Sequence, residues 1–91
     1  MSNDKFMTDD DVLKHLEQGV SDRAAAREVV EALEDELNYF VENTGKFMND
    51  VEYRAIKGDI LSRINKANEH LSHAAAKWHY FHYEATKRRL A

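Results

Sequence analysis

Residues 60 to 85 read ILSRINKANEHLSHAAAKWHYFHYEA and carry the strongest pattern in the chain. Apolar side chains recur along this stretch at alternating steps of four and three residues, which places them on one side of a helix. An average step of 3.5 residues keeps such a stripe against a second helix over its whole length. The pattern therefore predicts a long helix that packs along another helix. Its apolar stripe consists of Ile60, Ile64, Ala67, Leu71, Ala74, Trp78, Phe81 and Ala85.

The composition of the 91 residues favours an all-α fold. Proline is absent and glycine occurs three times, whereas Ala, Glu, Leu, Lys and Arg, which are strong helix formers, are frequent. A chain of this length is expected to form a single domain over residues 1–91, with a modest core and no room for an internal substrate pocket. The absence of cysteine excludes disulfides, thiolate metal sites and cysteine nucleophiles.

A short first helix is predicted over residues 9–18. Thr8 and Asp11 have the spacing of a capping box, in which each side chain accepts a hydrogen bond from the backbone of the other residue. Gly19 follows at the position where a glycine often ends a helix in the left-handed conformation. We therefore expect this helix to end before Gly19.

A second helix is predicted over residues 22–44. Ser21 or Asp22 supplies the cap at its start, and Gly45 offers a left-handed stop at its end. Its apolar stripe also steps by four and three residues, so this helix is a suitable partner for the long one. The stripe consists of Ala26, Val30, Leu33, Leu37 and Phe40.

The long third helix is predicted over residues 50–89. Asn49 and Glu52 form a second capping pair at its start. Gly58 lies on the side of the helix away from the stripe, where glycine lowers stability by about 1 kcal/mol relative to alanine without ending the helix. We therefore expect the helix to continue through Gly58.

These elements predict an antiparallel helical hairpin with a short N-terminal third helix. Because helix 50–89 is much longer than helix 22–44, its end with Trp78 and Phe81 extends beyond the hairpin partner. Helix 9–18 is too short to cover both aromatic side chains. A second copy of the chain would complete the cover, so the sequence favours a homodimeric helical bundle, with coiled-coil-like packing.

Charge is distributed unevenly along the chain. Residues 1–50 contain 13 Asp and Glu but 5 Lys and Arg, whereas residues 51–91 contain 4 and 8. Attraction between the two halves within one folded chain is the simplest interpretation, and two separate surfaces of opposite sign are the alternative. Glu31, Glu34 and Asp35 are candidate partner-binding residues because they belong to an acidic face that could meet a basic protein surface. The acidic face consists of Glu28, Glu31, Glu34, Asp35, Glu36 and Glu42.

Aromatic residues near the C-terminus form a second candidate binding surface. Tyr80, Tyr83 and Lys87 share the side of the long helix opposite the stripe, and two arginines follow directly. Exposed tyrosines beside cations are typical of protein interfaces and can also stack on nucleic-acid bases. Trp78 and Phe81 belong to the stripe, so they are expected either to be buried or to form an apolar end that binds a helix of another protein.

The histidines do not form a metal-binding pattern. His70 and His73 lie on one side of the predicted helix, whereas His79 and His82 lie on nearly the opposite side, so the four cannot bind one ion. No glutamate precedes a histidine by three residues, as di-iron bundles require. A site of two histidines completed by a second copy is the remaining metal hypothesis. No cofactor, metal or catalytic residue is predicted, and no catalytic motif is present in the sequence.

The sequence thus favours a non-enzymatic helical protein-interaction module, such as a small regulator, adaptor, assembly chaperone or inhibitor. A nucleic-acid-associated protein that uses the Tyr-, Lys- and Arg-rich C-terminal helix is the alternative, although few cations are available for it. A metal-binding bundle ranks third. The polar, acidic start of the chain does not resemble a signal peptide and no apolar run is long enough to span a membrane, so a cytoplasmic location is expected.

Overall fold

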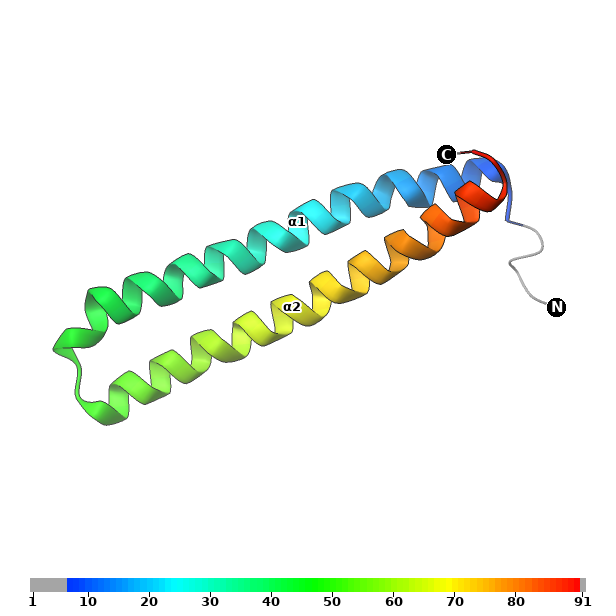
Figure 1. Ribbon diagram of the computed structural model, residues 1–91. Helices are drawn as coiled ribbons and strands as arrows, with labels where there is room; N and C mark the ends of the chain where they lie inside the picture. The colour runs from blue at the N-terminus through cyan, green and yellow to red at the C-terminus, as the bar shows by residue number, and fades with distance from the viewer. Residues whose placement is uncertain (1–6, 91) are drawn as a thin grey trace.

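The computed structural model describes residues 7–90 and contains two long α-helices. Helix α1 spans Asp9–Glu42, helix α2 spans Asp50–Lys87, and the short 3₁₀-helix η2 (Thr44–Phe47) joins them. The two long helices run in opposite directions side by side, so that the start of α1 and the end of α2 lie at one end of the molecule (Figure 1). No strand occurs in residues 7–90. The all-α prediction is therefore confirmed.

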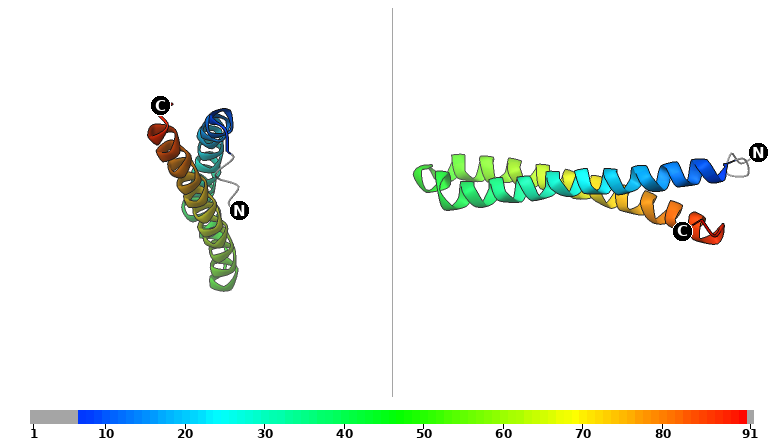
Figure 2. Two further views of the ribbon diagram at one scale, coloured as in Figure 1. Left: turned by 90° about the vertical axis from the view of Figure 1, so that its right-hand side faces the viewer. Right: turned by 90° about the horizontal axis from the view of Figure 1, so that it is seen from above.

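The molecule is a single layer of helices rather than a compact globule. Its principal extents are 59 × 25 × 14 Å, and the helices cross at a shallow angle, so that they diverge slightly toward the chain ends (Figure 2). The radius of gyration is 19.3 Å, whereas a compact domain of this length has about 12 Å. A large part of each helix is therefore accessible to solvent.

Two of the three predicted helix starts are confirmed, those at Thr8 and Asn49, whereas no helix begins at Ser21 or Asp22. The Thr8 hydroxyl accepts a hydrogen bond from the Asp11 backbone N–H at 3.1 Å, and the Asp11 carboxylate accepts one from the Thr8 N–H at 3.3 Å. At α2, the Glu52 N–H donates to the Asn49 side-chain oxygen at 2.9 Å. These bonds satisfy N–H groups that have no partner within the first helical turn.

The predicted break between helices 9–18 and 22–44 is wrong, because α1 continues through Gly19. Gly19 is buried, and a Cβ atom at this position would lie 2.9 Å from Cδ1 and 3.2 Å from Cβ of Trp78. Its φ angle is not positive, so it does not adopt the left-handed conformation of a helix end. The glycine instead provides the space that the Trp78 side chain needs against the α1 backbone.

Helix α1 ends at Glu42, two residues before the end predicted for helix 22–44. Gly45 has no positive φ angle, so it is not the left-handed stop that was predicted. Gly45 lies in η2, where a Cβ atom would come within 2.7 Å of the Tyr53 ring and 2.9 Å of the Phe40 carbonyl oxygen. The turn is therefore closed by packing of Tyr53, for which only glycine leaves room. At the other end of the chain α2 stops at Lys87, two residues before the predicted boundary, and the turn that follows places Arg89 at a φ of 61°.

The predicted stripe of α2 faces α1 along its whole length, since all eight of its residues are buried or half-buried. Phe40, Ile60 and Ile64 form the largest buried cluster, near the η2 end, and Leu33, Leu37, Met48 and Tyr53 pack against it. Val12, Phe81 and Ala85 are buried at the opposite end. The uninterrupted path of α2 through Gly58 is also confirmed.

The prediction that the long helix extends beyond its partner is also wrong, because α1 continues through Gly19. With 34 residues, α1 nearly matches the 38 residues of α2. Its first three turns, which were assigned to a separate short helix, lie against Trp78 and Phe81: Gly19 contacts Trp78, and the His15 ring stacks on Phe81 with centroids 4.5 Å apart. A second copy is therefore not needed to cover these two aromatic side chains.

Candidate functional site

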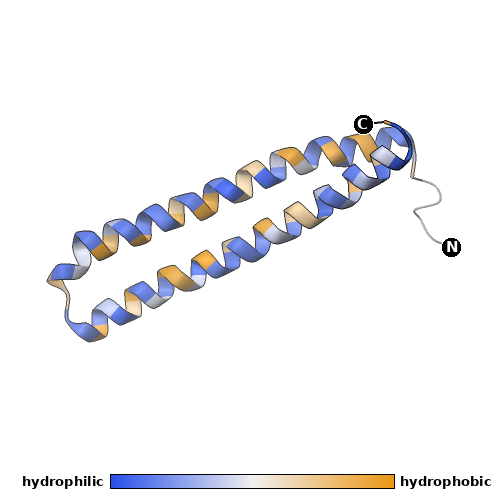
Figure 3. Ribbon diagram, viewed as in Figure 1, coloured by the Kyte–Doolittle hydropathy of each residue, from blue (hydrophilic) through white to orange (hydrophobic). Residues whose placement is uncertain are grey.

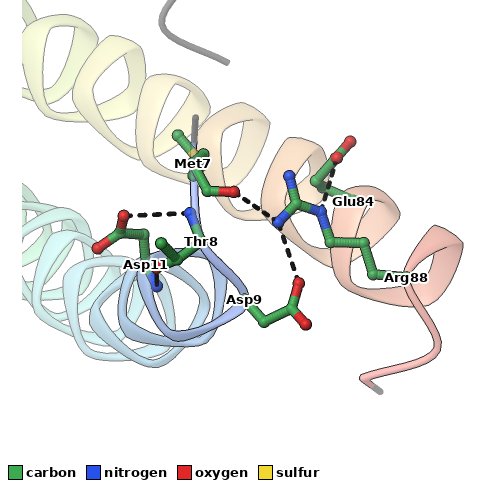
Figure 4. Close-up of polar contacts among 6 residues, drawn as sticks. All are labelled: Met7, Thr8, Asp9, Asp11, Glu84 and Arg88. Atoms are coloured by element: carbon green, nitrogen blue, oxygen red, sulfur yellow. Dashed lines mark hydrogen bonds and ion pairs between the residues drawn. The ribbon is translucent and has the colours of Figure 1, made fainter. Parts of the chain in front are cut away.

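Arg88, directly after α2, binds Met7 and Asp9 at the start of α1 (Figure 4). Its guanidinium donates hydrogen bonds to the Met7 carbonyl oxygen at 2.8 Å, to the Asp9 carboxylate at 3.1 Å and to the Glu84 carboxylate at 3.0 Å. The hydrogen bond to Glu84 raises the pKa of Arg88 above its usual value, and the bond to Asp9 adds to this shift. One of the three cations in the C-terminal cluster is thus used within the fold, which weakens the nucleic-acid hypothesis.

The tyrosine face of α2, formed by Tyr80, Tyr83 and Lys87, is accessible. Tyr80 and Tyr83 are 46% and 65% exposed, and Lys87 is exposed as well. Tyr80 lies at an edge-to-face angle against the neighbouring Phe81 ring, with centroids 5.1 Å apart. The three residues point away from α1, so they form an outward surface that a partner could reach.

The acidic face of α1 is also accessible, because Glu31, Glu34 and Asp35 are all exposed. Glu36 differs from them: it forms a two-bond ion pair with Arg63 of α2, at 3.2 and 3.3 Å. The hydrogen bond with Glu36 raises the pKa of Arg63 above its usual value. Within residues 7–90 this pair and the Arg88–Asp9 pair are the ion pairs that join α1 to α2. Most of the negative charge of α1 therefore stays unneutralised on its surface.

Trp78 and Phe81 lie between the helices and do not form an open binding site. Phe81 is buried, and the half-buried Trp78 ring is covered by the Arg23 guanidinium, whose carbon lies 4.7 Å from the ring centroid. The His82 ring stacks on the indole, with the ring centroids 4.8 Å apart. Trp78 Nε1 and Arg23 Nε are buried without a hydrogen-bond partner in the described part of the chain. The Arg23 guanidinium therefore makes a cation–π contact with an indole whose N–H has no hydrogen-bond partner in the described residues.

A second stripe on α1 was not predicted from the sequence. Five residues recur at intervals of exactly seven along one flank of α1: Leu13, Val20, Arg27, Glu34 and Val41. We call this set the flank stripe. All five are exposed, and the three apolar members are 39%, 57% and 38% exposed in chain order. The seven-residue spacing could have revealed this stripe in the sequence. It is hard to recognise because the buried stripes, with their steps of four and three residues, also repeat every seven residues.

An apolar groove of about 440 Å³ lies on the opposite flank of the helix pair. Its lining includes Ala26 of α1 and Ala67 of α2, whose small side chains leave space between the helices, together with Val29 and Leu33. Lys66 and His70 border it on the α2 side. The groove lies midway between the two well-packed ends, where the buried stripes consist mainly of alanine and valine.

The four histidines of α2 lie in two separate groups. His70 and His73 line a shallow hollow with Asp22, whereas His79 and His82 lie around the Trp78 ring. Among residues 7–90, no group of three or more His, Asp or Glu side chains has a geometry that could hold a metal ion.

Neither α1 nor α2 combines the length and the apolar character needed to cross a bilayer.

Comparisons with known proteins give no further identification. No protein-family model matches the chain, and neither a curated protein nor a solved structure shows significant similarity to it.

Proposed function

We propose that this protein is a helical interaction module that associates with a second copy of itself and presents charged and tyrosine-rich faces to a protein partner. The observation that carries the proposal is the large accessible surface of a single helical layer, on which many large hydrophobic side chains are exposed. The accessible surface is 6939 Å², whereas a compact monomer of this mass has about 5,500 Å². The excess exceeds the roughly 800 Å² that each partner buries in a standard interface.

The distribution of hydrophobic residues supports the same proposal. Figure 3 shows hydrophobic positions along the full length of both helices, interspersed with hydrophilic ones. Among residues 7–90, eight hydrophobic residues are buried, yet eleven large ones are exposed. Scattered exposed hydrophobic residues are normal, but a series of them along one helix is typical of an interface. In the flank stripe, three of the exposed residues lie on one side of α1.

The accessible acidic face suggests the chemistry of the partner. Glu31 and Asp35 are exposed and form no ion pair within the described residues. A face of this charge attracts a basic protein surface and speeds the encounter with it. The tyrosine face of Tyr80 and Tyr83 offers aromatic side chains of the type that contribute most to protein interfaces. A small regulator, adaptor or inhibitor would use these two surfaces.

Self-association makes thermal stability depend on protein concentration. If folded chains are paired, raising the concentration about a hundredfold should raise the midpoint of thermal unfolding by several degrees, because mass action favours the paired native state. Circular dichroism at 222 nm, recorded in cuvettes of different path length, measures the midpoint at each concentration. A midpoint that does not change with concentration would contradict self-association.

A further inference from the structure

We infer that the flank stripe of α1 is the self-association surface, and that two copies of α1 pair through it in antiparallel orientation with Arg27 of each chain facing Glu34 of the other. This inference rests on the proposed function, because it specifies the surface through which the chain pairs.

The order of residues along the stripe makes it complementary to itself. From the N-terminal end, the stripe carries two apolar residues, one cation, one anion and a final apolar residue: Leu13, Val20, Arg27, Glu34 and Val41. When a second copy is reversed and aligned so that Arg27 meets Glu34, Val20 meets Val41 at both ends of the contact. Each symmetric dimer would then contain two ion pairs and two apolar pairs, as a two-fold interface requires.

Charge disfavours the neighbouring arrangements. A parallel pair would place Arg27 beside Arg27 and Glu34 beside Glu34. An antiparallel pair shifted by one heptad would place one of these like-charged pairs at the symmetry axis. Repulsion between like charges in a partly desolvated contact disfavours such alternatives. One orientation and one register therefore pair Arg27 with Glu34 and Val20 with Val41, and leave Leu13 beyond the end of the paired segment.

The structure leaves these residues free for such a contact. Arg27 and Glu34 are both exposed, and neither forms an ion pair with any residue of the described chain. The α2 residue Leu61 is 41% exposed and supplies a further uncovered apolar side chain. A second copy is favoured over an unrelated partner because the pattern on the stripe is matched by the same stripe reversed.

Charge exchange tests this surface, with the dissociation constant of the dimer measured by sedimentation equilibrium. Arg27→Glu and Glu34→Arg should each weaken the dimer by at least about tenfold, because each single variant creates two like-charged pairs. A mixture of the two single variants should form heterodimers as strong as the wild-type dimer, since one chain is then acidic and the other basic at both positions. The double variant Arg27→Glu/Glu34→Arg should also restore pairing.

Lys66→Glu is the matched control, because it makes the same change in charge beside the groove on the opposite flank. It should leave the dissociation constant unchanged. A wild-type dimer that is insensitive to both stripe variants, or one that Lys66→Glu weakens, would overturn the inference and leave the proposed self-association standing. A monomeric wild-type protein would instead refute self-association itself.

Engineered cysteines test the orientation, since the chain has no cysteine of its own. Under oxidising conditions a mixture of Val20→Cys and Val41→Cys chains should form disulfide-linked heterodimers. Either variant alone should remain unlinked, because equivalent positions lie far apart in the antiparallel arrangement. Linkage of Val20→Cys to itself would indicate a parallel pair and would contradict the inference.

Discussion

Trp78→Ala is expected to lower the free energy of unfolding by about 3 kcal/mol, the lower end of the range for truncation of a packed tryptophan. The half-buried indole fills the space above Gly19 and lies under the Arg23 guanidinium, so its removal leaves a cavity between the helices and an unpartnered cation. Urea unfolding followed by circular dichroism, at one fixed protein concentration, measures the change.

Tyr80→Ala is the control for this substitution, because Tyr80 is an aromatic residue two positions away on the outward face of α2. Its free energy of unfolding should stay within about 0.5 kcal/mol of the wild-type value, as is usual for exposed positions. If the Trp78 and Tyr80 variants were equally stable, Trp78 would not be part of the core.

Gly19→Leu is expected to destabilise the protein by about 2 kcal/mol, even though leucine is a better helix former than glycine. A Cβ atom at Gly19 would already lie 2.9 Å from the Trp78 ring and 3.4 Å from the Trp78 Cα, so a larger side chain must push the helices apart. The same urea titration gives the free energy of unfolding for the variant.

Gly58→Leu is the matched control for Gly19→Leu. No atom of the described chain outside the local helix lies within 4 Å of a Cβ at Gly58, so leucine should stabilise the protein by roughly 0.5 to 1 kcal/mol through helix propensity alone. Combining Gly19→Leu with Trp78→Ala should cost less than the sum of the two single changes, because leucine would occupy part of the space that the indole leaves. Simple additivity would mean that Gly19 and Trp78 are not in contact.

The sequence predicted the helical content and the buried stripes because both follow from local spacing. The capping box at Thr8 and the side-chain cap at Asn49 were recognised because each requires only residues three positions apart. The α2 stripe from Ile60 to Ala85 was recognised because its steps of four and three residues repeat over seven turns.

The sequence could not predict that α1 continues through Gly19. A glycine that ends a helix and a glycine that admits a large side chain from another helix look identical in one dimension. Which role applies depends on whether Trp78, 59 positions further along, packs against that point. Because α1 continues through Gly19, it is nearly as long as α2. Trp78 and Phe81 are therefore covered by α1, whereas the sequence suggested that they are uncovered.

The exposure of the candidate surfaces agrees with the sequence-based expectation, whereas their role in binding stays a prediction. Glu31, Glu34, Asp35, Tyr80, Tyr83 and Lys87 are exposed, as an outward-facing surface requires. The hydrogen bonds of Arg88 to the start of α1 were not predicted, because its partners Met7 and Asp9 are distant in sequence. The flank stripe became apparent only when the structure showed that Leu13, Val20 and Val41 all stay exposed.

The central claim, that a second copy covers the exposed surface of this helical layer, is tested most directly by light scattering behind size exclusion. The wild-type protein should be measured over a range of concentrations, at low and at high salt. We expect a mass of twice the 10.6 kDa of one chain, with dissociation shifted to higher concentration at high salt, where the Arg27–Glu34 pairs are screened. A mass of 10.6 kDa at every concentration and both salts would contradict the claim.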